Sequence, residues 1–422
     1  MIDSITKTVA LVIFLSCYIL AITRKIKLAY VGIGSAIALL FVLLPTGGIT
    51  PEAAFSSINW GVLAIYWGFL MMAITFSKSG VPTKVARSIL KKTRNEGIAL
   101  FILCGLTALI SSFMENVGTV ILMAPIAIEV AKIARSSPFL HLVSIAISSN
   151  MVTTVTMIAD PPALILAENI GMKFTDFYLF NGKIGLGAIS ILGVIAGLAV
   201  MALINFRKMR KKILLKEEKV EVTYLPTILF AAGIIALALI PYLGVWNGWV
   251  GIGVGILAIL AGRKFIGKMF REFDWNSFFF IFGIFIVVGA VNFIGLLRDF
   301  AGFLLGLGLN NPVVVLAVIT WISVILSSFI DNVPFTMLMI PVCTTIAGSI
   351  SMSAYPLLYG MVVGTGIGGN VLPIGATANV FACGMLEKMG HKIRLREYLK
   401  LSLPSTIVSV GVAHLLLQLL WM

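Results

Sequence analysis

The chain has 422 residues, of which 59% are hydrophobic and 11% are charged, and its mean hydropathy is +1.08. Soluble domains carry about 25% charged residues, so this composition predicts an integral membrane protein and argues against a soluble enzyme or a secreted domain. The net charge of +14 comes from basic residues between apolar segments, which favours a role in membrane orientation over nucleic-acid binding. Four widely spaced cysteines indicate neither a disulfide framework nor a zinc site.

Ten segments are apolar over the length of about 20 residues that a membrane-crossing helix needs. They lie at 8–23, 28–45, 59–78, 139–168, 178–206, 226–241, 246–262, 275–297, 354–386 and 398–421. Two further pairs, 97–113 with 117–135 and 311–329 with 333–349, are each broken at a polar tip, which favours re-entrant helical hairpins. The basic segment 81–96 is predicted to be an interfacial connecting helix.

Two of the ten segments are interrupted in the middle. Asp160-Pro161-Pro162 breaks the segment 139–168, and a glycine-rich stretch at 364–369 followed by Pro373 breaks the segment 354–386. A break leaves backbone groups without helical partners, and lipid cannot satisfy them. Both breaks are therefore predicted to face a cavity lined by protein.

The sequence at the first hairpin tip recurs in the second half of the chain. SSFMENV at 111–117 matches SSFIDNV at 327–333, a spacing of 216 residues. The same spacing places the break at Asp160 on the segment 375–379, and Asn59-Trp60 falls on Asp274-Trp275 at a spacing of 215. Polar residues that recur at one spacing indicate an internal duplication.

The chain is thus predicted to consist of two halves, 8–206 and 224–421, joined by a basic cytoplasmic linker at 207–223. Each half crosses the membrane an odd number of times, so the halves are expected to be inverted relative to each other. With the N-terminus outside, 27 of the 31 Lys and Arg residues fall on one side, which identifies that side as cytoplasmic. Both termini then lie outside the plasma membrane, and the hairpin tips meet near its midplane.

Only a few acidic residues lie within apolar segments, among them Glu115, Asp160 and Asp331. An ionisable group in the membrane core costs about 3 kcal/mol or more and by default marks an ion or substrate pathway. The predicted substrate- and ion-binding residues are Glu115, Asn116, Thr119, Asp160, Asp331, Asn332, Thr336, Gly375, Thr377 and Asn379. Na⁺ is expected at Asn116, Asn332 and Asp331, and no cofactor other than a coupling Na⁺ or H⁺ is expected.

Glu115 and Asp331 also stand where acidic residues cap the helix that follows. Because Pro334 has no backbone N–H, capping explains Asp331 less well than Glu115. An unpaired carboxylate in an apolar setting binds a proton more readily, which would let it exchange H⁺ for Na⁺. We therefore expect Asp331 and Asn332 to form the centre of the coupling site, with Glu115 and Asn116 as their inverted partners.

These motifs resemble the ion transporter superfamily over essentially the whole chain. The resemblance rests on the paired tips, on Asp160-Pro161-Pro162 and, most specifically, on GNVLPIGATAN at 369–379. The superfamily includes arsenite permeases (ArsB), the P-protein group, citrate permeases, Na⁺/H⁺ antiporters of the NhaD type and divalent-anion/sodium symporters. The resemblance implies an all-α polytopic fold of two inverted repeats, with a scaffold that forms a homodimer and a transport domain that moves like an elevator.

The acidic tips resemble the ArsB, P-protein and citrate-permease-like branch most. In dicarboxylate symporters the tips read Ser-Asn-Thr, whereas here they read Glu115-Asn116-Val117 and Asp331-Asn332-Val333. A carboxylate repels a dianion unless a proton or cation neutralises it, so a di- or tricarboxylate is disfavoured. We expect a secondary active transporter of a small inorganic ion or oxyanion, arsenite included, coupled to H⁺ or Na⁺. The alternatives are an NhaD-type Na⁺/H⁺ antiporter and, from another class, a passive channel or a membrane scaffold.

The predicted transport domain comprises 97–168 and 311–386, and the predicted scaffold comprises 8–45, 178–206, 226–262 and 398–421. The expected partners are the lipid bilayer, the transported ion and a second copy of the chain. Neither enzymatic activity nor a nucleic-acid partner is expected.

Overall fold

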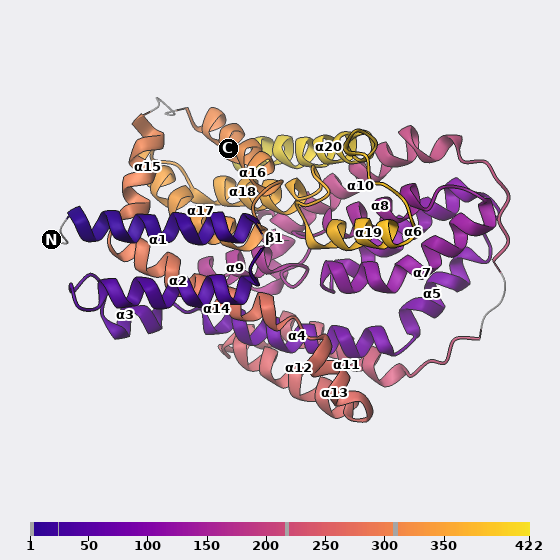
Figure 1. Ribbon diagram of the computed structural model, residues 1–422, viewed down its shortest axis with the longest axis horizontal. Helices are drawn as coiled ribbons and strands as arrows, with labels where there is room; N and C mark the ends of the chain where they lie inside the picture. Colours follow the sequence, from indigo (N-terminus) through magenta and orange to yellow (C-terminus); the bar gives the residue numbers. More distant parts are fainter. Residues whose placement is uncertain (1–3, 24, 216–218, 307–310) are drawn as a thin grey trace.

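The computed structural model describes residues 4–23, 25–215, 219–306 and 311–422, and this part of the chain is nearly all helical (Figure 1). Arg24 of the predicted cytoplasmic set and residues 216–218 of the predicted linker lie outside the described residues. Eight helices in the described ranges are long and apolar enough to cross a membrane, or nine if the bent pair Asn247–Ala261 and Arg263–Glu272 is one span. The protein is therefore a multi-pass membrane protein.

The first half runs from α1 to α10 and includes a short antiparallel hairpin of two strands, β1 (Leu179–Phe180) and β2 (Lys183–Ile184). Its helices are α1 (Ser4–Thr23), α2 (Leu28–Leu43), α3 (Pro51–Ser56), α4 (Trp60–Lys78), α5 (Val81–Leu90), α6 (Glu96–Ser111), α7 (Asn116–Ala134), α8 (Pro138–Asn150), α9 (Pro161–Ile170) and α10 (Leu186–Ile204).

The second half runs from α11 to α20. Its helices are α11 (Tyr224–Leu239), α12 (Asn247–Ala261), α13 (Ile266–Glu272), α14 (Trp275–Phe293), α15 (Leu296–Gly306), α16 (Pro312–Ser327), α17 (Asn332–Ser349), α18 (Ala354–Gly368), α19 (Thr377–Lys388) and α20 (Leu395–Trp421). The helices α6 to α9 each begin 216 residues before α16 to α19, and α3 to α5 each begin 215 residues before α13 to α15. The duplication seen in the sequence thus extends to the helix boundaries.

All ten predicted segments contain helices, but their detail differs from the prediction. The segment 178–206 opens with the β1–β2 hairpin, and its helix begins only at Leu186. The helices α3, α13 and α15 were not predicted, because their 6, 7 and 11 residues are too few to give a membrane-length apolar signal.

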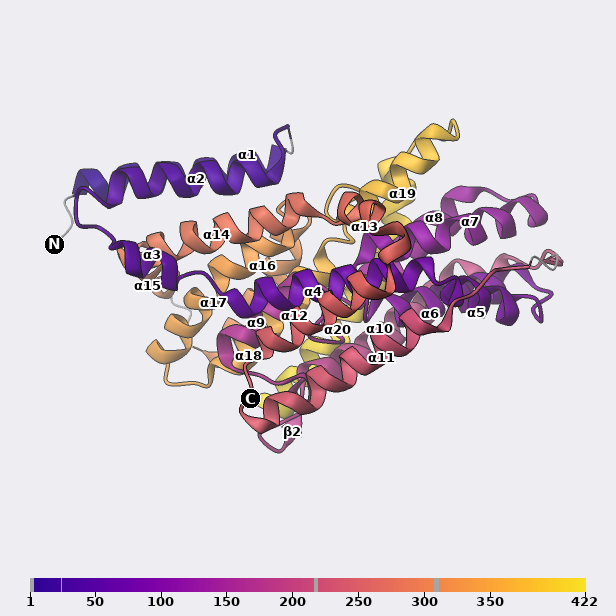
Figure 2. The ribbon, with the colours of Figure 1, turned by 90° about the horizontal axis from the view of Figure 1, so that it is seen from below.

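The two hairpins lie at opposite ends of the molecule's long axis. In Figures 1 and 2 the pair α6 and α7 occupies the end far from the N-terminus, and α16 and α17 occupy the other end. The first arms, α6 and α16, have 16 residues each, or about 24 Å of helix, which is shorter than the hydrocarbon core of a bilayer. Inverted halves with re-entrant hairpins require such an arrangement, and the inversion itself stays a prediction.

The helix α8 stops at Asn150 and α9 starts at Pro161, while α18 stops at Gly368 and α19 starts at Thr377. The second break contacts the end of α8, just before the first break. The side-chain amide of Asn370 donates to the carbonyl oxygen of Ile147 at 3.2 Å. The same oxygen also accepts the helical hydrogen bond from the N–H of Met151 at 2.9 Å, so Asn370 joins the second break to the last turn of α8.

Two helix pairs cross at glycines that leave no room for a side chain. A Cβ on Gly68 of α4 would lie 1.8 Å from the carbonyl oxygen of Gly251 in α12. A Cβ on Gly283 of α14 would lie 2.4 Å from the carbonyl carbon of Gly32 in α2. Each crossing joins a helix of one half to a helix of the other, so α4 is held on α12 and α14 on α2.

The helices α10 and α20 pack on each other and on the side of the molecule that holds the breaks. A Cβ on Gly193 of α10 would lie 2.7 Å from the carbonyl oxygen of Ser409 in α20. A Cβ on Gly197 would meet Met151 at the first break, and α20 also packs on α18. The assignment of 178–206 and 398–421 to the scaffold stays a prediction, and in the structure these helices pack with the broken ones. Small residues on α10 permit this approach, and hydropathy alone does not reveal it.

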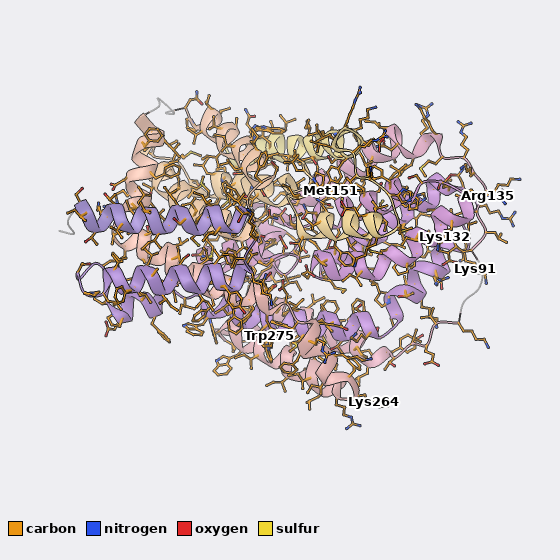
Figure 3. All side chains as sticks on the ribbon, in the orientation of Figure 1. Lys91, Lys132, Arg135, Met151, Lys264 and Trp275 are labelled. Carbon is orange, nitrogen blue, oxygen red and sulfur yellow. The ribbon has the colours of Figure 1, made fainter. Side chains whose placement is uncertain are left out.

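Figure 3 shows Lys91, Lys132 and Arg135 at the end of the molecule opposite the N-terminus. This end carries the first hairpin and the connecting helix α5. The helix α5 begins at Val81, where the predicted interfacial helix begins, and ends at Leu90 instead of 96.

Candidate functional site

Each hairpin tip places an acidic side chain at the start of its second helix. Glu115 caps α7: its Oε1 accepts from the N–H of Val117 at 3.1 Å and its Oε2 from the N–H of Gly118 at 2.9 Å. Asp331 caps α17 by accepting from the N–H of Val333 at 3.1 Å. Pro334 stands where Gly118 stands in the first half and has no N–H to donate. Both acids therefore act as caps, and the cap of Glu115 has one more hydrogen bond from the helix.

A serine orients the asparagine of each tip. The hydroxyl of Ser111 donates to Oδ1 of Asn116 at 2.8 Å, and the hydroxyl of Ser327 donates to Oδ1 of Asn332 at 2.6 Å. Because Oδ1 accepts from the serine, the amide NH₂ of Asn116 points away from it. This NH₂ lies 3.4 Å from Oδ1 of Asn150 and 3.5 Å from Oδ1 of Asp160, so the first tip and the first break meet through Asn116.

The first break presents Asp160 at the start of α9. Asp160 stands in the N-cap position but makes no capping hydrogen bond. Pro162 removes the N–H of the second helical residue, and the N–H of the third, Ala163, donates to the backbone carbonyl oxygen of Asp160 at 3.1 Å. Its carboxylate is therefore available to the space between the tips. The second break has Ala376 at the equivalent position, so the two halves differ in charge there.

These elements enclose a polar cavity of about 70 Å³. Its lining comprises Tyr66, Glu115, Asn116, Val117, Asn150, Asp160, Pro161, Asp274, Ser277, Asp331, Asn332, Val333, Gly375, Ala376, Thr377 and Ala378. In Figure 3, Met151 at the start of the first break and Trp275 beside Asp274 both lie near the middle of the long axis. A cavity of this volume has room for a few water molecules or a small ion.

Seven of the ten predicted site residues line this cavity. They are Glu115, Asn116, Asp160, Asp331, Asn332, Gly375 and Thr377. The structure brings together both hairpin tips and both breaks, which are far apart in the sequence.

Three predicted residues lie outside the lining. Thr119 donates to the carbonyl oxygen of Glu115 at 3.2 Å within its own helix. Asn379 donates to the carbonyl oxygen of Gly369 at 3.1 Å and to Oδ1 of Asn370 at 3.2 Å. Thr336 is fully buried in α17. Thr119 and Asn379 thus support the tip and the break from behind.

Four polar lining residues were missed by the sequence analysis. Tyr66 and Asn150 stand in apolar helices and carry no motif. Asp274 and Ser277 come from the first turn of α14. The recurrence of Asn59-Trp60 at Asp274-Trp275 marked the position in the sequence, but only as part of the repeat.

All described charged residues that line the cavity are acidic. Glu115, Asp160, Asp274 and Asp331 line it, and none of the described residues in its lining is Lys, Arg or His. Among the described residues, no three His, Cys, Asp or Glu side chains are close enough to form a ready metal site. The arrangement therefore attracts cations without forming a rigid metal cage.

A smaller apolar pocket of about 30 Å³ adjoins the cavity. It shares Tyr66, Glu115, Asp160 and Pro161 with the polar cavity, and its remaining wall comes in equal parts from α4 and from the first tip, the first break and α9. One face of the two carboxylates is thus bounded by apolar side chains. Such surroundings strengthen electrostatic interactions within the cavity.

Comparison with known proteins agrees with this architecture. Residues 18–364 match the family described as Citrate transporter (CitMHS). The chain belongs to the citrate transporter family. The family resemblance read from the tips and breaks is confirmed, and this citrate transporter family member is a membrane transporter.

Relatives match over nearly the full length. An uncharacterized transporter of Mycobacterium tuberculosis is 27% identical over 434 residues, which cover 97% of this chain and 98% of the relative. The P protein of Mus musculus is 24% identical over 488 residues, which cover 94% of this chain and 58% of that protein. The similarity to the P protein agrees with the branch that the acidic tips indicated.

Two solved structures share the fold of this citrate transporter family member. The YdaH transporter of Alcanivorax borkumensis has a TM-score of 0.57 at 15% identity, with 91% of this chain and 88% of that chain covered. MtrF of Neisseria gonorrhoeae, from a class of antimetabolite efflux pumps, has a TM-score of 0.56 at 12% identity, with coverages of 98% and 94%. At these identities the likeness concerns the fold alone.

Proposed function

We propose that this protein is a secondary active transporter that moves a small inorganic ion or oxyanion across the plasma membrane, coupled to H⁺ or Na⁺. The observation that carries the proposal is the cavity between the hairpin tips and the breaks, where four acidic residues face one space and the described lining contains no basic residue. Carboxylates in a membrane interior are costly, and their cost is offset when they bind protons or metal cations. The coupling cation is thus the ligand that this cavity suits best.

The negative charge of the cavity also restricts which substrates it can accept. The family description names citrate. A citrate trianion would meet Glu115, Asp160, Asp274 and Asp331, so it could enter only together with cations that neutralise it. A neutral hydroxylated metalloid such as arsenite, or a weakly charged oxyanion, avoids this repulsion. Asn116, Asn332 and Thr377 offer hydrogen bonds to such a solute.

Na⁺/H⁺ exchange is the second candidate, because the carboxylates could carry both cations without a further substrate. It differs from the first proposal in one measurable respect. An antiporter moves Na⁺ in response to a pH gradient in the absence of any oxyanion, whereas a symporter needs the substrate. A passive channel would need neither gradient and would not saturate.

Transport requires that the cavity open alternately to the two sides. We propose that the hairpins, the broken helices and the associated α10 and α20 move as one body. The helices α2, α4, α12 and α14, held together in pairs by their glycine crossings, form the core of the static scaffold. The scaffold would form the homodimer contact. The basic end seen in Figure 3 would face the cytoplasm, with both termini outside.

The test uses purified protein in proteoliposomes with imposed Na⁺ or H⁺ gradients and arsenite, phosphate, sulfate or citrate as solute. We expect saturable, gradient-driven uptake of one of these solutes. Asp331→Asn should abolish coupled uptake, and Glu115→Gln should reduce it less completely. Glu52→Gln, an exposed acid in α3, is the matched control and should transport normally. Full coupled uptake by Asp331→Asn would show that this residue serves only as a cap.

A further inference from the structure

Asp274 differs from the other three acids of the cavity in where it comes from. Glu115 and Asp331 belong to hairpin tips and Asp160 to a break, whereas Asp274 caps α14. Its Oδ1 accepts from the N–H of Ser277 at 3.0 Å, and its Oδ2 accepts from the hydroxyl of Ser277. Both carboxylate oxygens are therefore held at the first turn of α14.

The helix α14 is in turn fixed to α2. The N–H of Ala29 in α2 donates to Oδ1 of Asn276 at 3.0 Å. Farther along the pair, Gly283 and Gly32 bring the two backbones together without side chains between them. Asp274 is thus carried by the α2–α14 pair and not by the hairpins or the breaks.

The first half contains a natural comparison for Asp274. Asn59 stands at the equivalent position and caps α4, where its Oδ1 accepts from the N–H of Val62 at 3.1 Å. An asparagine caps a helix about as well as an aspartate does. The negative charge of Asp274 is therefore not needed for capping.

The two equivalent caps line different spaces. Asp274 lines the carboxylate cavity, whereas Asn59 lines a larger crevice of about 830 Å³ bounded by α3, α4, α14 and α17. The described lining of that crevice contains no charged side chain, and its polar groups include Asn59, Asn169, Asn292 and Thr344. One capping position thus offers a carboxylate to the tips, and its equivalent offers a neutral amide to the other space.

We propose that Asp274 is a fixed specificity-determining residue that strengthens cation binding in the conformation seen here, and that Asn59 takes its place beside the tips in the opposite conformation. This inference rests on the proposed function, in which the tips and breaks move past the scaffold. The site then keeps three acids throughout and gains the fourth on one side of the membrane only. Because a nearby unit charge changes cation affinity by roughly tenfold, the coupling cation binds more tightly on that side.

The first test measures binding without transport. Purified protein in detergent is titrated with Na⁺, with choline as the ionic-strength control, and its thermal stability is followed. Asp274→Asn should raise the half-saturating Na⁺ concentration about tenfold. It should leave the melting temperature in choline unchanged, since asparagine keeps the cap as Asn59 does.

Glu272→Gln is the matched control. Glu272 lies two residues before Asp274, pairs with Lys78 at 2.7 Å and does not line the cavity. Its substitution should leave the Na⁺ titration as in the wild type. An equal half-saturating Na⁺ concentration in the wild type and in Asp274→Asn would overturn the proposal, as would a wild type that responds to Na⁺ no more than to choline.

The second test measures the Na⁺ dependence of uptake from each side of the membrane separately, in proteoliposomes in which the orientation of the protein is known. Asp274→Asn should weaken the Na⁺ dependence of uptake from one side only. Asn59→Asp should strengthen it from the other side. Equal effects on both sides would overturn the assignment of these residues to opposite conformations. Failure of the proposed function is recognised differently, as no gradient-driven flux in the wild type, while the binding titration still reports on Asp274.

Discussion

The side-chain amide of Asn150 donates to the carbonyl oxygen of Gly366 at 3.0 Å, and the two residues occupy equivalent positions 216 apart in the two halves. The contact joins the same point of both broken helices at the wall of the cavity, which Asn150 lines. Gly366 has no room for a side chain, because a Cβ there would lie 2.0 Å from Oγ1 of Thr153. The two halves therefore interlock at their breaks, where backbone groups most need partners.

Asn150→Leu should destabilise the protein by about 1–3 kcal/mol, because the buried Gly366 carbonyl loses its donor. Thermal unfolding of the purified protein in detergent measures this loss. The control is Asn169→Leu, since Asn169 donates within its own helix, to the carbonyl oxygen of Ile165 at 2.7 Å. Equal melting temperatures for the two variants would contradict the role of Asn150 in joining the breaks.

Gly68→Ala should disrupt the α4–α12 crossing, because its Cβ would lie 1.8 Å from the Gly251 carbonyl oxygen and the backbones would have to separate. We expect a marked loss of folded protein in fluorescence-detected size-exclusion chromatography. Gly253→Ala on α12 is the control, since a Cβ at Gly253 meets nothing within 4 Å. If Gly68→Ala eluted as the control does, the crossing would not be a rigid part of the scaffold.

The end of α9 is tied to the turn between α11 and α12. The side-chain amide of Asn247 donates to Oε1 of Glu168 at 2.7 Å, and the hydroxyls of Thr175 and Tyr242 lie 2.5 Å apart. These contacts join the part proposed to move with the part proposed to stay. They must break in each transport cycle if the breaks move past the scaffold.

Crosslinking the double variant Thr175→Cys/Tyr242→Cys with a short bis-maleimide should therefore stop transport. The four native cysteines are buried, which limits background reaction. Each single variant treated with the same reagent is the control and should remain active. Undiminished flux in the crosslinked double variant would exclude a relative movement of these two segments.

Glu96 and His141 form a buried pair outside the cavity, with 1% and 0% of their surfaces exposed. The ring Nδ1 of His141 lies 3.2 Å from the carbonyl oxygen of Ser137, which can only accept, so Nδ1 carries hydrogen. Its Nε2 then faces Oε1 of Glu96 at 3.6 Å, and neither atom has a hydrogen-bond partner among the described residues.

Glu96→Gln should be tolerated, because the amide can donate to Nε2 of His141. Glu96→Leu should be less stable than Glu96→Gln by about 1–3 kcal/mol, because leucine places no polar group opposite the buried Nε2. Melting temperatures at neutral pH distinguish the two variants. A Glu96→Leu variant as stable as Glu96→Gln would show that the pair contributes nothing to stability.

The helices, the hairpins and the breaks could be predicted because their signals are local. Apolar length marks a helix, and a polar pair or a proline marks its interruption, as at Asn116 and Pro161. The site could be predicted only in part. Thr119 was expected in the cavity because it lies near the tip in sequence, but its hydroxyl bonds back to Glu115 in the same helix.

Asp274, in contrast to Thr119, lines the cavity although it was not predicted to do so. It lies outside every hairpin and break, and it reaches the cavity only because α14 packs on α2 at two glycines. The crossing depends on the absence of side chains at Gly32 and Gly283, which hydropathy does not detect. Tyr66 reaches the same cavity from α4, whose crossing with α12 depends on Gly68 in the same way.

The sequence by itself determined that the protein lies in a membrane, that it has two similar halves, and that each half carries an acidic tip. Those features follow from the free-energy cost of placing charges and unpaired backbone groups in lipid. This cost applies in any membrane-spanning segment, however the helices pack against one another. Only the tertiary structure decided which side chains share the cavity and which helices pack with the breaks. These depend on the rotation of each helix and on how closely two backbones approach, and both are set by contacts between segments far apart in the chain.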